Sequence, residues 1–161
     1  MKFDYRMFLA KNFSNLLFKF RKFDQRSRVL MYHSFEENAY KDYKNLYSLK
    51  KNIFIEQLTY LINNKYRIIK INKIKYQPKE ILFTFDDGYE SLNSFIEPIF
   101  NKFNIPFTVF LSPKFIESND SRFINKKKLF KMSLNNNIDI GAHGFNHIDL
   151  SNLNYNELKS E

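Results

Sequence analysis

Hydrophobic residues along the chain form short continuous runs that alternate with longer stretches of helical spacing. The continuous runs predict strands, at residues 28–33, 66–69, 81–85, 107–111 and 138–141. Between them, apolar residues recur every three or four positions and predict helices over 54–62, 92–103 and 126–134. This alternation is typical of a parallel sheet covered by helices, either an open doubly wound sheet or a barrel. Five strands are too few for a closed barrel of eight.

Single residues refine the outline of the helices and loops. Pro98 lies inside the apolar pattern of 92–103 and is expected to bend that helix, because proline has no N–H to donate. Asn154, with Glu157 three residues later, has the pattern of a capping box at the start of a last helix. The segment after His33 is polar and rich in Tyr, which predicts a loop.

Residues 1–27 are predicted to form a basic N-terminal arm that precedes an α/β domain over residues 28–161. Five apolar side chains recur in the arm at helical spacing and predict an amphipathic helix. They are Leu9, Phe13, Leu16, Leu17 and Phe20.

The charge of the arm leaves three interpretations open. Residues 1–28 hold eight Lys or Arg against two Asp, which is most of the formal charge of +9. In the first interpretation, the arm is a solvated basic face. In the second, its apolar side packs on the domain or on a partner, and in the third it contacts an anionic membrane surface. No apolar run approaches the roughly 20 residues of a membrane span, and no secretory signal is present. The sequence therefore predicts a location in the cytoplasm or at the membrane periphery.

Composition excludes several classes of site and partner. Apolar residues make up 43% of the chain, with 19 Phe and 10 Tyr, so a disordered chain is not expected. The chain has no Cys, which excludes disulfides, thiolate metal sites and a cysteine nucleophile. Any metal must be held by His, Asp or Glu. Nucleic acid is not an expected partner, because the domain lacks a basic stripe interleaved with stacking aromatics.

The side chains that can carry chemistry collect at the carboxyl ends of predicted strands. All three histidines of the chain, His33, His143 and His147, lie at or soon after such ends, and so do Asp86 and Asp87. In parallel α/β folds the loops at that edge of the sheet converge and build the functional site. The topology alone therefore predicts that these five side chains share one site.

Each of the two motifs also has a plain structural interpretation. Adjacent carboxylates in Thr84–Tyr89 (TFDDGY) require a cation or strong donors if they are buried, yet Asp-Asp-Gly is also ordinary turn chemistry. Histidines at i and i+4, as in His143-Gly-Phe-Asn-His147, can reach one metal from one side of a helical turn. Together the motifs supply two imidazoles and a carboxylate, a ligand set that suits Zn²⁺ with an open position for water.

At these residues the chain resembles carbohydrate esterase family 4, the polysaccharide deacetylases with a NodB-homology domain. That family combines a T-F-D-D-G motif with a later H-[ST]-x-x-H motif. Here TFDDGY precedes HGFNH, with 56 positions from Asp87 to His143, and RVLMYH at 28–33 is similar to the branch that deacetylates poly-N-acetylglucosamine. The resemblance implies a partial NodB-homology domain over 28–161, which is an incomplete, distorted (β/α) barrel.

The resemblance also implies roles for the residues that match its motifs. Asp87, His143 and His147 would hold a divalent metal, with Zn²⁺ expected, and Asp86 would be the catalytic base. The implied substrate is an acetylated polysaccharide, from which N-acetyl groups are removed. The family usually works outside the cytoplasm, in contrast to the absence of an export signal here.

The chain departs from the family pattern at two places. Gly144 stands where Ser or Thr is usual, so a hydrogen bond near the metal is expected to be missing. The later motifs of the family include a histidine that acts as the catalytic acid. They have no counterpart before Glu161, which suggests a truncated product or one piece of a split protein. We expect His33 to serve as the missing acid, with a structural histidine as the alternative. A remnant that binds metal or glycan without turnover, or that needs a complementing chain, is the alternative function.

Overall fold

The structure is a computed structural model and describes residues 27–36 and 48–161. The amphipathic helix predicted for the N-terminal arm lies outside the described residues and stays a prediction. Among the described residues, no helix combines the length and the apolar character that a membrane span requires.

Five parallel strands form the central sheet, so the predicted α/β fold with parallel strands is confirmed. The strands are β1 (Arg28–Tyr32), β4 (Arg67–Ile68), β5 (Glu80–Asp86), β6 (Phe107–Leu111) and β7 (Ile138–Ala142). Their order is β1-β5-β6-β7, and β4 also pairs with β5. Ile81 of β5 pairs with both Arg28 and Ile68, so β1 and β4 lie on opposite edges of β5. The described strands form an open sheet with β1 and β7 at its edges.

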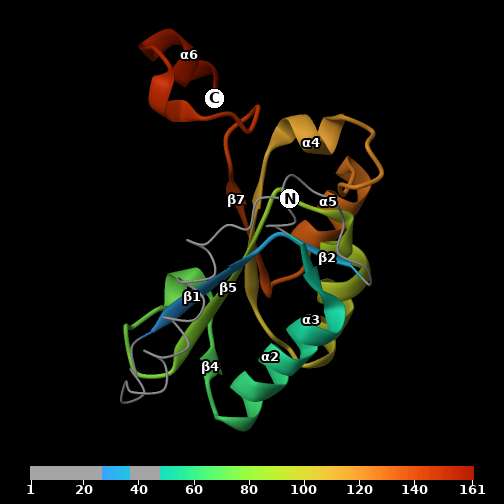
Figure 1. Ribbon diagram of the computed structural model, residues 1–161, viewed down its shortest axis with the longest axis vertical. Helices are drawn as coiled ribbons and strands as arrows, with labels where there is room; N and C mark the ends of the chain where they lie inside the picture. The colour runs from blue at the N-terminus through green and yellow to red at the C-terminus, as the bar shows by residue number, and fades with distance from the viewer. Residues whose placement is uncertain (1–26, 37–47) are drawn as a thin grey trace, which may run out of the picture.

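Helices connect the strands and cover the sheet (Figure 1). The α-helices are α2 (Lys51–Asn63), α3 (Glu97–Lys102), α4 (Pro113–Glu117), α5 (Lys126–Ser133) and α6 (Tyr155–Ser160). Two short 3-10 helices are η2 (Ile71–Lys73) and η4 (Leu150–Asn152). The predicted helices over 54–62 and 126–134 are confirmed as α2 and α5. Asn154 and Glu157 form the predicted capping box at the start of α6.

Pro98 shapes the helix that the sequence predicts over 92–103. The segment begins as a π-helical turn, η3 (Leu92–Ile96), and continues as α3, with Pro98 in the first turn of α3. The N–H of Glu97 donates to Leu92 O, five residues back, in the wider π pattern. The predicted bend is therefore accommodated as a change of helical pitch at the residue before the proline.

The predicted loop after His33 is partly wrong, because a second, two-stranded parallel sheet begins there. It pairs β2 (Ser34–Glu36) with β3 (Ser48–Lys50). Phe35 of β2 is fully buried, and its N–H donates to Ser91 Oγ at 3.0 Å. A three-residue strand with one apolar residue has too little alternation to be recognised in the sequence.

Phenylalanine rings fill the core between the sheet and the helices. All seven residues of β5 are buried, as expected for a central parallel strand. Phe83 and Phe85 face Phe100 of α3 at ring-centroid distances of 5.2 and 5.9 Å, and Phe54 of α2 closes the cluster. Side chains alternate along a strand. Asp86 therefore points to the face of the sheet opposite to Phe85.

Candidate metal centre

The register of the sheet brings the ends of four strands to the same level. Tyr32, Phe85, Val109 and Ile140 pair in sequence across β1, β5, β6 and β7 and so form one row. The next residues along β1 and β5 are His33 and Asp86. The predicted convergence of the site residues thus follows from strand pairing.

Asp87 is the first residue of a sharp turn after β5. It is 4% exposed and has a φ of 68°, and Gly88 follows with a φ of 73°. Asp is one of the few residues with a side chain that adopt this left-handed conformation. Only Gly fits at the second position, because a Cβ there would lie 2.5 Å from Leu111 Cδ2. The turn directs the Asp87 carboxylate into the loops at the strand ends.

The histidine motif forms a loop and not the helical turn that the i, i+4 spacing of His143 and His147 would allow. Gly144 and His147 have φ values of 73° and 54°, which interrupt any helix. The loop is anchored to the end of β6. His143 N–H donates to Leu111 O at 2.9 Å, and Ser112 Oγ–H donates to His143 O at 2.9 Å. The left-handed backbones of Gly144 and His147 turn the loop so that the two imidazoles lie together. In a helix, the i, i+4 spacing would bring them together instead.

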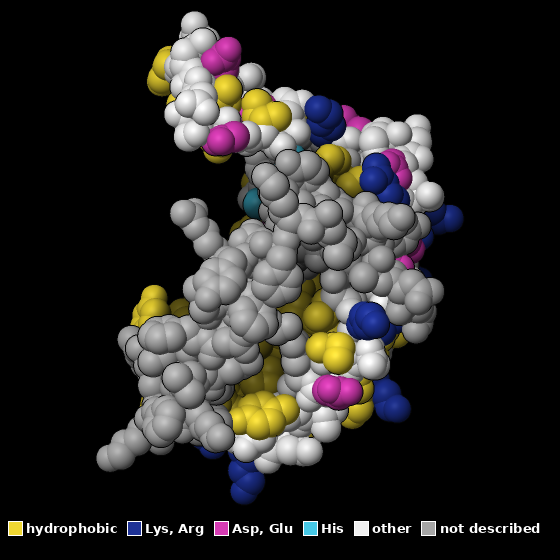
Figure 2. All heavy atoms as spheres, in the orientation of Figure 1, with side chains coloured by type: hydrophobic (Ala, Val, Ile, Leu, Met, Phe, Trp, Pro, Cys, Tyr) yellow, Lys and Arg dark blue, Asp and Glu magenta, His cyan; other side chains and the backbone are white. Residues whose placement is uncertain are grey.

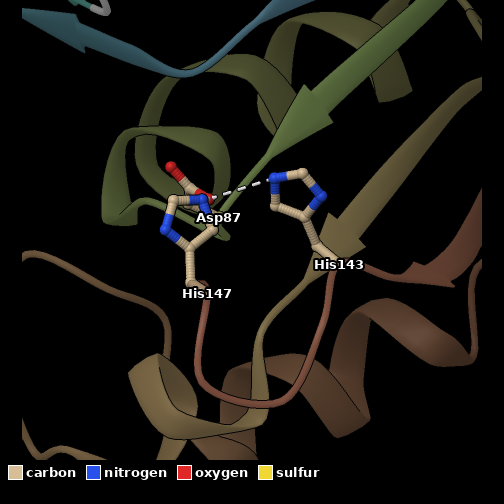
Figure 3. A group of neighbouring side chains, drawn as sticks. All are labelled: Asp87, His143 and His147. Carbon is tan, nitrogen blue, oxygen red and sulfur yellow. Dashed lines mark ion pairs between the residues drawn. The ribbon is translucent and has the colours of Figure 1, made fainter. Parts of the chain in front are cut away.

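Both imidazoles converge on one oxygen of Asp87 (Figure 3). Asp87 Oδ1 lies 3.0 Å from His147 Nε2 and 3.6 Å from His143 Nε2. One ligand atom from each of the three residues lies within 4.8 Å of the other two. Two imidazoles and a carboxylate thus surround one point in space.

Two observations of this arrangement fit a bound divalent cation. Asp87 Oδ1 is buried and accepts no hydrogen bond, which is a costly state for a carboxylate oxygen unless a cation compensates it. A tetrahedral Zn²⁺ with ligands at about 2.0–2.1 Å holds neighbouring donor atoms roughly 3.3 Å apart. The two distances from Asp87 Oδ1 lie on either side of this value.

Asp86 lies beside these three residues. It is 7% exposed, and its Oδ2 is 3.9 Å from His143 Nε2. Burial raises the pKa of Asp86, and the charge of Asp87 acts in the same direction, whereas the charges of His143 and His33 oppose the shift. The carboxylate of Asp86 is therefore a stronger proton acceptor than an exposed aspartate.

His33 follows β1 directly and is half-buried. Its charge acts on Asp86, which places it near the metal centre, but it is not one of the three residues that could hold an ion. The preceding Tyr32 belongs to the core, where burial raises its pKa to about 12, and its hydroxyl donates to Gln57 Oε1. His33 is thus held at the site by the end of an edge strand whose Tyr32 side chain packs against the core.

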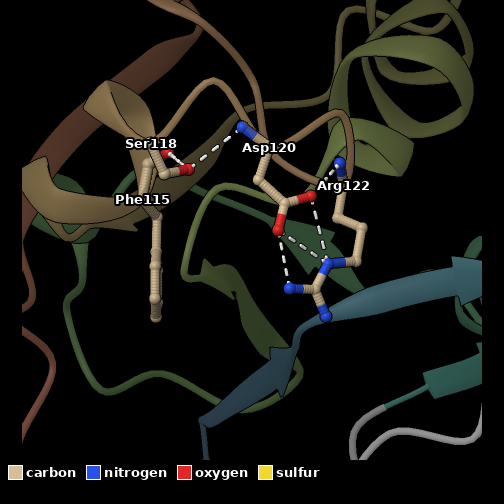
Figure 4. A network of polar contacts seen from close by, with 4 residues as sticks. All are labelled: Phe115, Ser118, Asp120 and Arg122. Atoms are coloured by element: carbon tan, nitrogen blue, oxygen red, sulfur yellow. Dashed lines mark hydrogen bonds and ion pairs between the residues drawn. The ribbon is translucent and has the colours of Figure 1, made fainter.

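Phe115 of α4 also contacts the centre and was missed in the sequence. Its ring lies 5.2 Å from that of His147 and stacks on Phe123 at 4.4 Å. The loop that joins Phe115 to Phe123 is stabilised by polar contacts (Figure 4). Ser118 Oγ–H donates to Phe115 O, and Arg122 donates from Nε and Nη2 to the Asp120 carboxylate. One phenylalanine among 19 carries no distinguishing signal in the sequence.

Comparison with protein families gives one match, and it covers both motifs. The model for the polysaccharide deacetylase family matches residues 73–161, which is more than half of the chain. No curated protein matches the chain.

Solved structures of deacetylases share the fold. A de-N-acetylase from Aggregatibacter actinomycetemcomitans is 22% identical with a TM-score of 0.61, over 73% of this chain and 54% of that one. The deacetylase PplD from Streptococcus pyogenes, in complex with acetate, is 19% identical with a TM-score of 0.70, over 84% and 64%. IcaB from Ammonifex degensii is 22% identical with a TM-score of 0.62, over 74% and 53%. The chain thus corresponds to between 53% and 64% of these three structures.

Proposed function

The chain belongs to the polysaccharide deacetylase family, and we propose that it is a metal-dependent hydrolase that removes N-acetyl groups from a polysaccharide. The observation that carries the proposal is the buried Asp87 Oδ1, which has no hydrogen-bond donor and faces two imidazole nitrogens. A bound cation would compensate the buried carboxylate and would take both imidazole nitrogens as further ligands.

Asp87, His143 and His147 would hold the cation in this proposal, with Zn²⁺ as the expected ion. When bound, such an ion polarises a carbonyl oxygen and lowers the pKa of water to about 7. The three residues leave the carboxylate of Asp86 beside the ion and outside its ligand set.

Asp86 and His33 would move the protons of the reaction. As water attacks the acetamide carbonyl carbon, the Asp86 carboxylate takes the proton that the water loses. The C–N bond then breaks, and the leaving amine nitrogen takes a proton from an acid, the role we propose for His33. The products are acetate and a free amine on the sugar. The position of Asp86 beside the three residues and outside their ligand set supports its role as the acceptor.

A second candidate function is metal or glycan binding without turnover, by this chain alone or before it joins a complementing chain. This chain corresponds to about half to two thirds of each of the three deacetylase structures.

Acetate release from N-acetylglucosamine oligomers tests the proposal. We expect release by the Zn²⁺-loaded protein, none after chelation, and a loss of about 10²–10⁴-fold in Asp86→Asn, which removes the base. Asp149→Asn is the matched control, because Asn caps η4 as well as Asp does. If the wild type binds Zn²⁺ but releases no acetate, the second candidate function is the correct one.

A further inference from the structure

Glu161 holds the histidine loop from the side away from the sheet. Its backbone carbonyl accepts the N–H of Phe145 at 3.1 Å. Its Oε2 accepts the N–H of Asn146 at 2.9 Å, and its Oε1 accepts Asn146 Nδ2–H at 2.7 Å. One residue thus provides three acceptors to the two residues that immediately precede His147.

The loop depends on such contacts, because it has no secondary structure of its own. Gly144 and His147 both have positive φ, and a left-handed residue other than Gly persists only where its surroundings determine it. Asn146 precedes His147, and both its backbone N–H and its side-chain amide are held by the same carboxylate. The direction of the His147 ring therefore depends on Glu161.

Helix α6 presents Glu161 to the loop. The capping box fixes the first turn of α6, since the Asn154 side chain accepts from Glu157 N–H and the Glu157 carboxylate accepts from Asn154 N–H. Figure 1 shows α6 standing away from the sheet, beyond the end of β7. Residues 155–160 of α6 are exposed. The three hydrogen bonds that Glu161 accepts connect the C-terminal end of α6 to the histidine loop.

Lys114 holds the opposite side of the same loop. Its backbone N–H donates to Phe145 O at 3.1 Å, and its positive charge acts on the Glu161 carboxylate. Phe145 is therefore fixed by its carbonyl at the start of α4 and by its N–H at Glu161. A loop held on both sides presents two ligands in one fixed geometry.

We propose that Glu161 is a positioning residue of the metal centre, which fixes the loop so that His143 and His147 face Asp87. This inference depends on the proposed metal site. Gly144 cannot make the hydrogen bond that Ser or Thr would make near the metal, and Glu161 supports the loop next to that position. A Cβ at Gly144 would lie 3.4 Å from Glu161 Oε2, so the two residues are direct neighbours.

Zinc affinity of Glu161 variants tests the inference in the full chain. We expect Glu161→Ala to weaken Zn²⁺ binding by about 10–100-fold, as loss of a group that orients a ligand does. Glu161→Gln keeps one side-chain carbonyl oxygen as an acceptor, so its loss of Zn²⁺ affinity is expected to be smaller than that of Glu161→Ala. Glu56→Ala is the matched control, because it removes an exposed carboxylate of α2 and leaves α6 and the loop unchanged, and it is expected to change affinity by less than about threefold. Affinity is measured by competition with a chromophoric chelator.

Three further measurements separate positioning from general stability. The visible spectrum of bound Co²⁺ is expected to change in Glu161→Ala, while the melting temperature of the metal-free protein stays close to wild type. Excess Zn²⁺ is expected to restore acetate release by Glu161→Ala, because the variant has a weakened affinity for the ion and keeps the catalytic residues. An unchanged Co²⁺ spectrum with Zn²⁺ affinity within twofold of wild type overturns the inference.

The outcomes distinguish this inference from the proposed function. A wild type that binds Zn²⁺ without acetate release refutes the enzymatic proposal, and the affinity series still decides the role of Glu161. A wild type that binds no Zn²⁺ refutes the metal site and the positioning role with it.

Discussion

The three glycines of the chain separate two effects that are usually mixed, backbone strain and lack of space. Gly88 and Gly144 share a φ of 73°, whereas Gly141 does not have a left-handed backbone. A Cβ at Gly88 would lie 2.5 Å from Leu111 Cδ2, and one at Gly141 would lie 2.6 Å from two atoms of the Phe110 ring. At Gly144 the nearest atom is 3.4 Å away. Gly144 therefore carries strain alone, Gly141 crowding alone, and Gly88 both.

We expect Gly88→Ala, which combines strain and crowding, to lose more stability than Gly144→Ala or Gly141→Ala, each of which has one of the two effects. An L-residue in the left-handed region costs about 1–2 kcal/mol, and forcing a methyl group into a packed site costs about 1–3 kcal/mol. We expect a loss of about 1–2 kcal/mol for Gly144→Ala and about 1–3 kcal/mol for Gly141→Ala. Gly88→Ala is expected to lose roughly 2–5 kcal/mol, since Leu111 is buried and has little room to move.

Urea unfolding with chelator present measures these losses without a contribution from bound metal. Alanine also reduces the entropy of the unfolded chain, by about 0.4–1 kcal/mol. This contribution is common to the three variants and cancels in their comparison. For a chain of this length each 1 kcal/mol shifts the melting temperature by about 2–4 °C. Equal losses in Gly88→Ala and Gly144→Ala would refute the argument that Leu111 leaves no space beside the turn.

Three further variants test the metal site, a buried carboxylate and the core. Asp87→Asn is expected to abolish the stabilisation by Zn²⁺, which is about 2.7 kcal/mol at 100 times the dissociation constant, and calorimetry with and without the ion measures it. Burial raises the pKa of Glu80, but hydrogen bonds from Gln77 and Lys75 and the charge of Arg67 hold it below its usual value. Glu80→Gln is therefore expected to destabilise most at pH values where an ordinary glutamate is ionised, and the difference from wild type is expected to shrink as the pH falls through the lowered pKa of Glu80. Phe100→Ala is expected to lose about 3–5 kcal/mol in urea unfolding.

Each of these variants has an outcome that contradicts its reasoning. A zinc-induced shift that persists in Asp87→Asn would exclude that carboxylate as a ligand. A stability difference for Glu80→Gln that is constant with pH would show that the charge of Glu80 is not involved. A loss below about 1 kcal/mol for Phe100→Ala would mean that the cluster collapses around the missing ring.

The strands and the membership of the site were predictable because they depend on local pattern and parallel order. Continuous apolar runs mark buried parallel strands, and the ends of parallel strands meet at one edge. The loop conformation of His143–His147 was not predictable, because spacing of i and i+4 suits a helix and a loop equally well. Its shape is set by contacts with Ser112 and Glu161, which are distant in the sequence. Phe115 was missed for the same reason, since its position beside His147 follows from tertiary packing.

The local conformation of the site opposes folding, which is consistent with the proposed cation as a stabilising partner. Asp87 and His147 both have left-handed backbones, and the Asp87 carboxylate is buried with one oxygen that accepts no hydrogen bond. Such features cost of order 1–3 kcal/mol each and persist only where the surroundings impose them. The phenylalanine core between β5, α2 and α3 provides that stability at a distance from the chemistry. In the proposed metal site, a cation bound at Asp87 Oδ1 would recover the electrostatic part of this cost, and the geometry of its ligands would already be in place.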